Sequence, residues 1–183
     1  ADSIVKGMLQ HSRTSSGVKE PTDINTLCDE YLRLAYHGLR AKDNAFNAIL
    51  NTDCDSEIGK ITIEAQEIGR VILNILTNAF HAVLDRQGKD GEKFKPKITV
   101  KTQKTADYVL ITIEDNGNGI HKAQKDKVFE QFYRIPTGDT HNVKGFGIGL
   151  YYTKKIIEKH GGSINIIYDK NNNTLFKIEL PIS

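Results

Sequence analysis

Sulfur is scarce in this sequence, which contains two cysteines and one methionine, and tryptophan is absent. Cys28 and Cys54 are far apart, so they lack the close cysteine spacing that structural zinc sites use. We therefore expect no cysteine-based metal site and two reduced thiols in a cytoplasmic protein, with a single disulfide as the alternative.

Long hydrophobic runs and a strong charge of one sign are also missing. No apolar stretch reaches the length of a membrane-spanning helix, and no signal peptide opens the chain. The net charge of +2 is too small to favour nucleic acid or an anionic membrane as the main partner. The composition, 38% hydrophobic and 26% charged, is typical of a soluble globular domain. Because residue 1 is alanine, we expect a piece of a longer protein, whose parent could be membrane-anchored.

The spacing of apolar residues predicts helices and neighbouring strands in a definite order. A helix tail is predicted around residues 4–9, then a loop at 13–22, then a helix from Thr22 or Asp23 to about Ala45. Because strands then come as neighbours, we predict an α+β sandwich with helices on one face of a mixed sheet. The remaining predicted elements are strands at 47–53 and 59–65 around a turn at 56–59, a helix at 66–87, paired strands at 97–103 and 108–115, a helix at 147–162 ended by Gly161, and a closing hairpin of strands at 163–169 and 174–182.

The helix predicted at 66–87 has an unusual polar face. Asn74, Asn78, His81 and Asp85 follow each other at helical spacing, opposite a wide apolar face. A solvated face is the simple interpretation, but asparagine is a poorer helix former than Lys, Glu or Gln. Its neutral carbonyl oxygen suits a magnesium ion that carries phosphates, so a functional face is the alternative. The apolar face consists of Ile68, Val71, Ile72, Ile75, Leu76, Ala79 and Val83.

The stretch "IEDNGNGI" at 113–120 places Asp115 just after a predicted strand, with Gly117 and Gly119 behind it. A calcium loop is excluded because the further spaced acids are missing, and no strand follows at once to make a hairpin. A buried carboxylate that accepts a hydrogen bond from an exocyclic amine fits better, since the glycines allow the backbone to approach a flat ring.

A second glycine-rich stretch, "KGFGIGLYYTKK" at 144–155, opens a predicted helix. Glycines there leave backbone N–H groups exposed at a helix N-terminus, which favours phosphate, and Lys144 adds positive charge. The spacing matches neither the P-loop nor GxGxxG, so a plain helix start remains possible. The polar stretch "RIPTGDTHNV" before it has the length and composition of a functional lid or a disordered loop.

Four segments in this order resemble the ATP-binding catalytic domain of sensor histidine kinases in the GHKL superfamily. They are "LNILTNAFHAV" at 73–83, "DNGNGI" at 115–120, "VFEQFYR" at 128–134 and "GFGIGL" at 145–150, and "EKHGGSI" is the usual ending of the next helix. The likeness runs from Thr22 to Ser183. It implies the Bergerat fold, a two-layer α/β sandwich with a mixed, mostly antiparallel sheet, which agrees with the predicted order of elements.

The resemblance also implies a site for ATP and Mg²⁺. Asp115 stands at the position that binds the adenine amino group, and Asn78 stands at the magnesium position, with Asn74 as a further ligand. Asn78 and Arg134 are the implied catalytic residues, and Arg134 would stabilise charge on the transferred γ-phosphoryl group. The other implied nucleotide-binding residues are Gly117, Gly119, Ile120, Lys144, Gly145, Gly147, Gly149, Leu150 and, where the family often has Lys or Arg, His81.

One departure separates this sequence from the ATPases of the superfamily. Those enzymes carry a Glu one turn before the principal Asn as the base for water, whereas this chain has Asn74, which cannot take a proton. The sequence therefore favours a protein-histidine kinase over a hydrolase. A serine kinase of the anti-sigma type and a non-enzymatic nucleotide-sensing module also fit the four segments, although the N-terminal helix tail disfavours the serine kinase.

The resemblance divides the chain into two parts. Residues 1–18 would be the end of a dimerisation and histidine-phosphotransfer helix with its linker, and residues 19–183 would be the catalytic domain. His11 lacks a following acid, so we expect the phosphoacceptor to lie outside this chain. The implied partners are the protein's own dimerisation domain and a response-regulator receiver domain, with a homodimer in the full-length protein.

Overall fold

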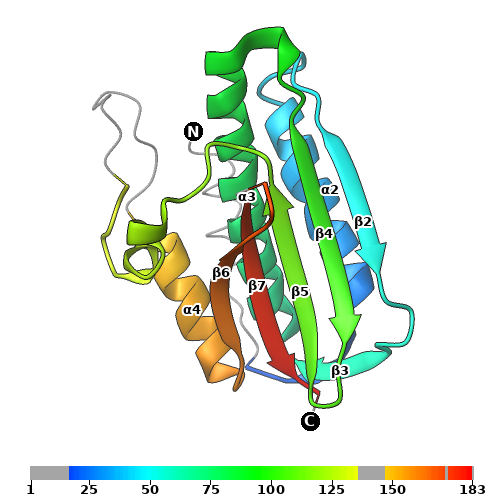
Figure 1. The fold of residues 1–183 in the computed structure, drawn as a ribbon. Helices are drawn as coiled ribbons and strands as arrows, with labels where there is room; N and C mark the ends of the chain where they lie inside the picture. Colours follow the sequence, from blue (N-terminus) through cyan, green and yellow to red (C-terminus); the bar gives the residue numbers. More distant parts are fainter. Residues whose placement is uncertain (1–16, 136–146, 172, 183) are drawn as a thin grey trace.

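The computed structural model describes residues 17–135, 147–171 and 173–182. Its main sheet has five strands in the order β2, β4, β5, β7, β6, and helices cover one face of it (Figure 1). β2 runs parallel to β4, and the other neighbouring strands are antiparallel. The predicted α+β sandwich with a mixed sheet is therefore confirmed. The strands are β2 Ile49–Cys54, β4 Lys97–Lys104, β5 Tyr108–Asp115, β6 Ser163–Tyr168 and β7 Thr174–Pro181.

In the described part of the chain, three α-helices form the second layer, and the longest of them lies in the middle. α3, Ala65–Asp90, contacts α2, Ile24–Arg40, on one side and α4, Gly149–Lys159, on the other (Figure 1). Short 3-10 helices η2, η3 and η4 cover Gly91–Lys93, Lys122–Gln124 and Lys127–Phe129. Among the described residues, no helix combines the length and the hydropathy that crossing a membrane requires.

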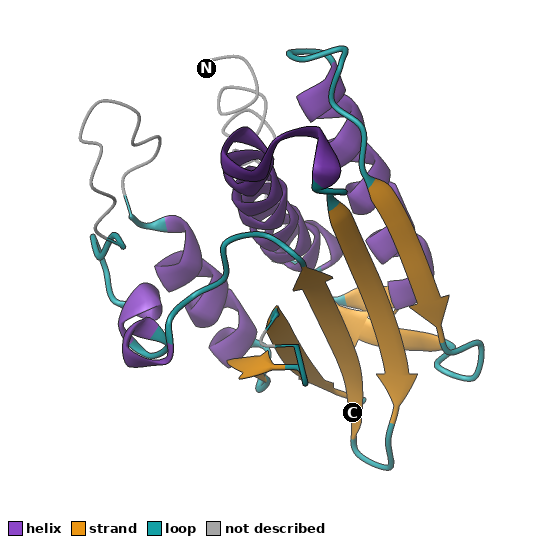
Figure 2. Cartoon of the chain, turned by 45° about the horizontal axis from the view of Figure 1, so that its top comes forward, coloured by secondary structure: helices purple, strands orange, loops and turns teal. Residues whose placement is uncertain are grey.

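The core lies between α3 and the sheet because both elements bury their predicted apolar faces. On β5 the buried side chains alternate with half-exposed ones, so every second residue points to the helices. The opposite face of the sheet carries no helix in the described part of the chain (Figure 2). The fully buried side chains of this core include Ile68, Ile72, Ile75, Leu76, Ile98, Ile111, Ile113, Ile166 and Ile178.

Several predicted elements are confirmed with small changes of boundary. Asp23 caps α2, since its Oδ1 accepts a hydrogen bond of 3.0 Å from Thr26 N. Gly161 follows α4 with a φ of +73°, as expected for a glycine that ends a helix. α2 ends at Arg40 rather than near Ala45, because Asp43 Oδ1 accepts a bond from Ala45 N and makes a turn there.

The two short strands predicted at 47–53 and 59–65 are present as β2 and β3, Lys60–Ile63, on either side of a turn. They do not pair with each other: β2 pairs with β4, and β3 pairs with β1, Glu20–Asp23, in a separate two-stranded sheet. β1 lies partly in the stretch predicted as a loop, because its pairing partner is distant in sequence and leaves no local pattern. The helix tail predicted around residues 4–9 lies outside the described residues.

Two glycines of α3 give a matched test of its packing. An added Cβ at Gly88 meets nothing within 4 Å, so Gly88→Ala is expected to raise the free energy of unfolding by about 0.5–1 kcal/mol. At Gly69 a Cβ would run into the ring of Tyr31 on α2, so Gly69→Ala is expected to lower it by roughly 1–3 kcal/mol. Urea unfolding of both variants measures the difference; equal shifts would contradict the α2–α3 packing.

Candidate functional site

Asp115 is a buried carboxylate at the end of β5. Its side chain belongs to the face of the sheet that meets α3, and the residue pairs with Ile98 of β4 and Thr174 of β7. Only 5% of Asp115 is exposed, and burial raises the pKa of its carboxyl to about 6. Gly117 N donates a hydrogen bond of 2.9 Å to Oδ1, which orients the carboxylate. The site thus holds a strong hydrogen-bond acceptor in an apolar setting.

The loop after Asp115 is pressed between α3 and the start of β7. A Cβ on Gly117 would stand 2.5 Å from the carbonyl carbon of Ala82, so only glycine allows this approach to α3. Gly119 has a φ of +73°, and Ile120 N donates a hydrogen bond of 2.9 Å to Thr174 Oγ1. The two glycines therefore serve close backbone packing at this place.

The polar face of α3 runs alongside this loop. Asn78, His81 and Asp85 lie on it, with Asn78 and His81 exposed and Asn74 half-buried. Asn74 Nδ2 donates a hydrogen bond of 2.8 Å to Thr153 Oγ1 on α4. The asparagine therefore connects α3 to α4, and its carboxamide is held in one orientation.

The N-terminus of α4 meets the same asparagine. α4 begins at Gly149, and a Cβ there would lie 2.8 Å from Asn74 Oδ1. No side chain of the described residues caps this helix, so its first N–H groups keep their capacity to bind an anion. Leu150 and Ile120 pack partly buried against the core. Lys144 and Gly145, the other residues predicted for this end of the site, lie outside the described residues.

The described residues ahead of the second glycine stretch, 128–135, pack partly against the core. Phe129 is buried and makes an edge-on contact with Phe176, with 6.4 Å between ring centroids. Phe132 is 67% exposed and has a φ of +65°, which is rare for a residue with a side chain. Its N–H donates to Gly147 O at 2.9 Å, so 132 and 147 are adjacent. Arg134 is exposed next to Gly147.

Several residues of this region were not predicted from the sequence. Thr174 accepts a hydrogen bond from Ile120 N, and Thr153 accepts one from Asn74 Nδ2. Ala82 is the residue of α3 against which Gly117 packs. Two of them left a signal: Ala82 is a small residue one turn after Asn78, and the alternation of 174–180 puts Thr174 on the inward face. Thr153 left none, because its bond joins residues far apart in the chain.

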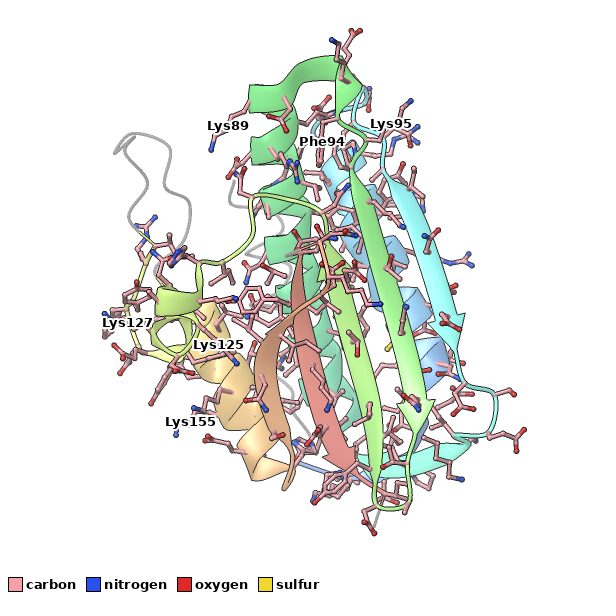
Figure 3. All side chains as sticks on the ribbon, viewed as in Figure 1. Lys89, Phe94, Lys95, Lys125, Lys127 and Lys155 are labelled. Carbon is pink, nitrogen blue, oxygen red and sulfur yellow. The ribbon has the colours of Figure 1, made fainter. Side chains whose placement is uncertain are left out.

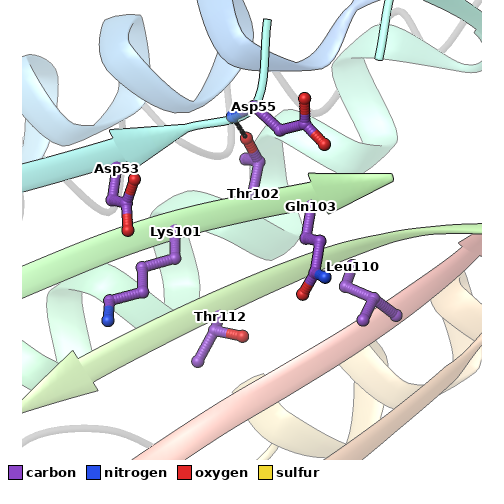
Figure 4. A pocket seen from close by; sticks show the side chains of 7 residues that line it. All are labelled: Asp53, Asp55, Lys101, Thr102, Gln103, Leu110 and Thr112. Atoms are coloured by element: carbon purple, nitrogen blue, oxygen red, sulfur yellow. Dashed lines mark hydrogen bonds between the residues drawn. The ribbon is translucent and has the colours of Figure 1, made fainter. Parts of the chain in front are cut away.

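A shallow hollow on the open face of the sheet is separate from this region. It measures about 290 Å³ and lies over β2, β4 and β5 (Figure 4). The carboxylate of Asp55, which lines the hollow, accepts hydrogen bonds from Glu57 N and Lys104 N, each 2.9 Å long. Both oxygens of this carboxylate are thus engaged by the protein's own backbone, and we do not assign a ligand to the hollow. The lining residues are Asp53, Asp55, Lys101, Thr102, Gln103, Leu110 and Thr112.

The comparison with known families agrees with this geometry. Residues 59–183 match the family described as histidine kinase-, DNA gyrase B- and HSP90-like ATPases. The chain belongs to that family. The match includes α3, the loop after Asp115 and α4, so every described site residue lies within it. Together with its relatives, it identifies an ATP-binding catalytic domain of the histidine kinase type.

The curated relatives of this kinase-type domain are longer proteins. Sensor protein RprX of Bacteroides fragilis (strain YCH46) is 36% identical over 141 residues, which cover 77% of this chain and 26% of RprX. Alginate biosynthesis sensor protein KinB of Pseudomonas aeruginosa is 27% identical over 179 residues, which cover 98% of this chain and 28% of KinB. The chain thus spans about a quarter of the length of these two relatives.

Solved structures of histidine kinases share the fold. The catalytic domain of histidine kinase ThkA superposes with a TM-score of 0.70 at 25% identity, covering 90% of this chain and 95% of that one. Full-length ShkA in complex with AMPPNP gives a TM-score of 0.70 at 17% identity, covering 90% of this chain and 31% of ShkA. The ShkA likeness concerns the fold alone.

Proposed function

We propose that this domain binds ATP with Mg²⁺ and transfers the γ-phosphoryl group to a histidine on a dimerisation domain. In this step the bond from the γ-phosphorus to the bridging oxygen breaks, a phosphorus–nitrogen bond forms on the imidazole, and ADP leaves. The observation that carries the proposal is the buried Asp115 carboxylate at the end of β5, next to the asparagine face of α3.

The adenine would bind at Asp115. The carboxylate accepts a hydrogen bond from the 6-amino group, and burial strengthens this bond because water does not compete for the oxygen. Gly117 and Gly119 let the loop pack closely against α3 and Thr174 beside the carboxylate, and Ile120 supplies an apolar contact. A base without the amino group would leave the buried carboxylate without its partner, which gives selectivity for adenine.

The triphosphate would extend from there toward α4. The Oδ1 of Asn78, and that of Asn74, are suitable ligands for magnesium, which neutralises phosphate charge when bound. N–H groups at Gly145, Gly147 and Gly149 and the charge of Lys144 bind phosphate oxygens, and His81 adds a ring N–H. Arg134 stabilises the developing charge on the γ-phosphoryl group, and Leu150 covers the site.

Kinase activity fits these residues better than hydrolysis does. Asn74 occupies the place of a water-activating carboxylate, and it is engaged with Thr153. We assign residues 1–18 to the end of the dimerisation and phosphotransfer helix and 19–183 to the catalytic domain. The partners are then that dimerisation domain, in a cytoplasmic homodimer, and a response-regulator receiver domain; no nucleic acid is involved.

We expect Asn78→Ala to reduce phosphoryl transfer at least 100-fold while the fold stays intact, because Asn78 is exposed and would hold the magnesium ion. The assay mixes the protein with radiolabelled ATP, Mg²⁺ and a separate histidine-bearing dimerisation domain. Asn165→Ala, an exposed asparagine of β6, is the matched control and should transfer at the wild-type rate.

Two results would count against this function. Nucleotide binding without any transfer by the wild-type protein would indicate a nucleotide-sensing module. Phosphate release without phosphohistidine would indicate an ATPase.

A further inference from the structure

Arg86 lies on α3 about two turns beyond Asn78 and reaches the loop that follows Asp115. One guanidinium nitrogen, Nη1, donates to Asn116 O at 2.8 Å and to Gly117 O at 3.4 Å. Nε donates to Asp90 Oδ2 at 3.0 Å. The single side chain therefore joins the last turns of α3 to two successive carbonyl groups of the loop.

The guanidinium group of Arg86 also stacks on an aromatic ring. It lies over the ring of Phe94, 4.7 Å from the centroid, and Phe94 packs partly buried against the core. Figure 3 shows Phe94 beside the end of α3, where the chain turns through η2 into β4. Asp90 and Phe94 together restrict the orientation of Arg86, so its donors stay directed at the loop.

The loop is held on its other side by β4. Asn116 Nδ2 donates to Lys95 O at 2.9 Å, and its Oδ1 accepts a bond of 2.9 Å from Lys97 N. Arg86 and Asn116 thus hold the peptide groups at 116 and 117 between α3 and β4. Gly117 N belongs to this restrained segment, and it is the donor that orients the Asp115 carboxylate.

We propose that Arg86 is a positioning residue for base recognition, acting on Asp115 through the backbone of Asn116 and Gly117. This inference rests on the proposed function, because it takes Asp115 as the acceptor for the 6-amino group of adenine. Arg86 does not touch the base in this arrangement; it sets how firmly the carboxylate is oriented. Its loss weakens discrimination between purines more than it weakens binding of the phosphates.

Besides its contact with the Phe94 ring, Arg86 makes an ion pair with Asp90, which can be removed separately. This ion pair is partly solvent-exposed, with 39% and 49% of the two side chains accessible, and such pairs contribute little to stability. Hydrogen bonds from a charged donor to the loop carbonyls are stronger. Arg86→Met removes those donors but keeps a long chain over Phe94, and Asp90→Asn removes the ion pair but leaves the carbonyl contacts in place.

The test is calorimetric titration of wild type, Arg86→Met and Asp90→Asn with ATP and with inosine triphosphate, each with Mg²⁺. Inosine triphosphate carries an oxygen in place of the 6-amino group and keeps the same phosphates. We expect the ratio of the two dissociation constants to fall at least fivefold in Arg86→Met and to change less than twofold in Asp90→Asn. Partial unfolding would lower the number of sites and leave this ratio unchanged.

An unchanged ratio in Arg86→Met would overturn the inference while the proposed function stands, provided that the wild type prefers ATP. A wild type that binds neither nucleotide, or both equally, would overturn the proposed function and the inference with it. Should Arg86→Met fail to fold, Arg86→Lys replaces it: lysine keeps one charged donor, and an intermediate ratio is expected. A wild-type ratio in Arg86→Lys, with Arg86→Met unfolded, would mean that Arg86 is needed for the fold only.

Discussion

Replacing Gly117 with alanine is expected to abolish detectable nucleotide binding. The new Cβ would stand 2.5 Å from the carbonyl carbon and 2.7 Å from the carbonyl oxygen of Ala82, and these backbone atoms of α3 cannot move aside. The loop has to lift from the helix instead, which breaks the bond from Gly117 N to Asp115 and the contact with Arg86. Overpacking of this kind typically costs about 1–3 kcal/mol in the free energy of unfolding.

The matched control is Asn118→Ala in the same loop, because Asn118 is exposed. Titration with a non-hydrolysable ATP analogue, together with thermal unfolding, should separate the two variants. The double variant Ala82→Gly with Gly117→Ala is expected to stay inactive, since the clash involves the backbone of residue 82 as well as its Cβ. Wild-type affinity in Gly117→Ala would show that the loop does not need its contact with α3 for binding.

The parts of the fold that the sequence predicted are those with strong local periodicity. α3 was expected at 66–87 and extends over Ala65–Asp90, because its apolar residues recur at helical spacing from Ile68 to Leu84. The hairpins β4–β5 and β6–β7 were expected for the same reason, since each pair is joined by a short turn. Local pattern fails where pairing is distant, as between β1 and β3.

The same distinction applies to the site: residues with a local sequence signal were predicted, and contacts between distant elements were not. Asp115 and the glycines behind it were found because an acid followed by glycines is unusual after a strand, and the structure has the acid buried and Gly117 against α3. The contact from Asn74 to Thr153 and the contact from Arg86 to the loop could not be predicted. Each depends on the angle between elements that are distant in the sequence, and that angle is set by packing of the whole core.

Asparagine at position 115 is expected to stabilise the fold at neutral pH and to destroy adenine recognition. Burial raises the pKa of Asp115 to about 6 from 3.8, so the folded protein binds more protons than the unfolded chain between these values. Stability therefore falls as the pH rises through this window, and the ionised carboxylate costs up to roughly 3 kcal/mol above it. Asp115→Asn removes this cost, so its gain in the free energy of unfolding is present at pH 7 and vanishes below about pH 4.

Asp115→Asn is expected to lower the affinity for ATP at least 100-fold. Gly117 N already bonds to Oδ1 of Asp115, so in the variant the amide carbonyl takes that position and the NH2 group faces the amino group of adenine. Two donors then meet in a buried place, where neither finds water. The wild type should likewise lose affinity as the pH falls below about 6, because the protonated acid is the weaker acceptor.

Urea unfolding at pH 4 and pH 7, and titration with ATP at pH 5.5 and pH 7.5, measure both effects on the same variant. Asp107→Asn is the control, since it makes the same chemical change at an exposed position in the turn before β5. A variant at position 115 that loses stability at pH 7 would mean that the carboxylate supports the fold rather than the ligand. If Asp115→Asn kept the wild-type affinity for ATP, the adenine would not be recognised by Asp115. Stability gained together with binding lost is the pattern of a residue kept in the core for its ligand, because the fold alone favours the neutral side chain.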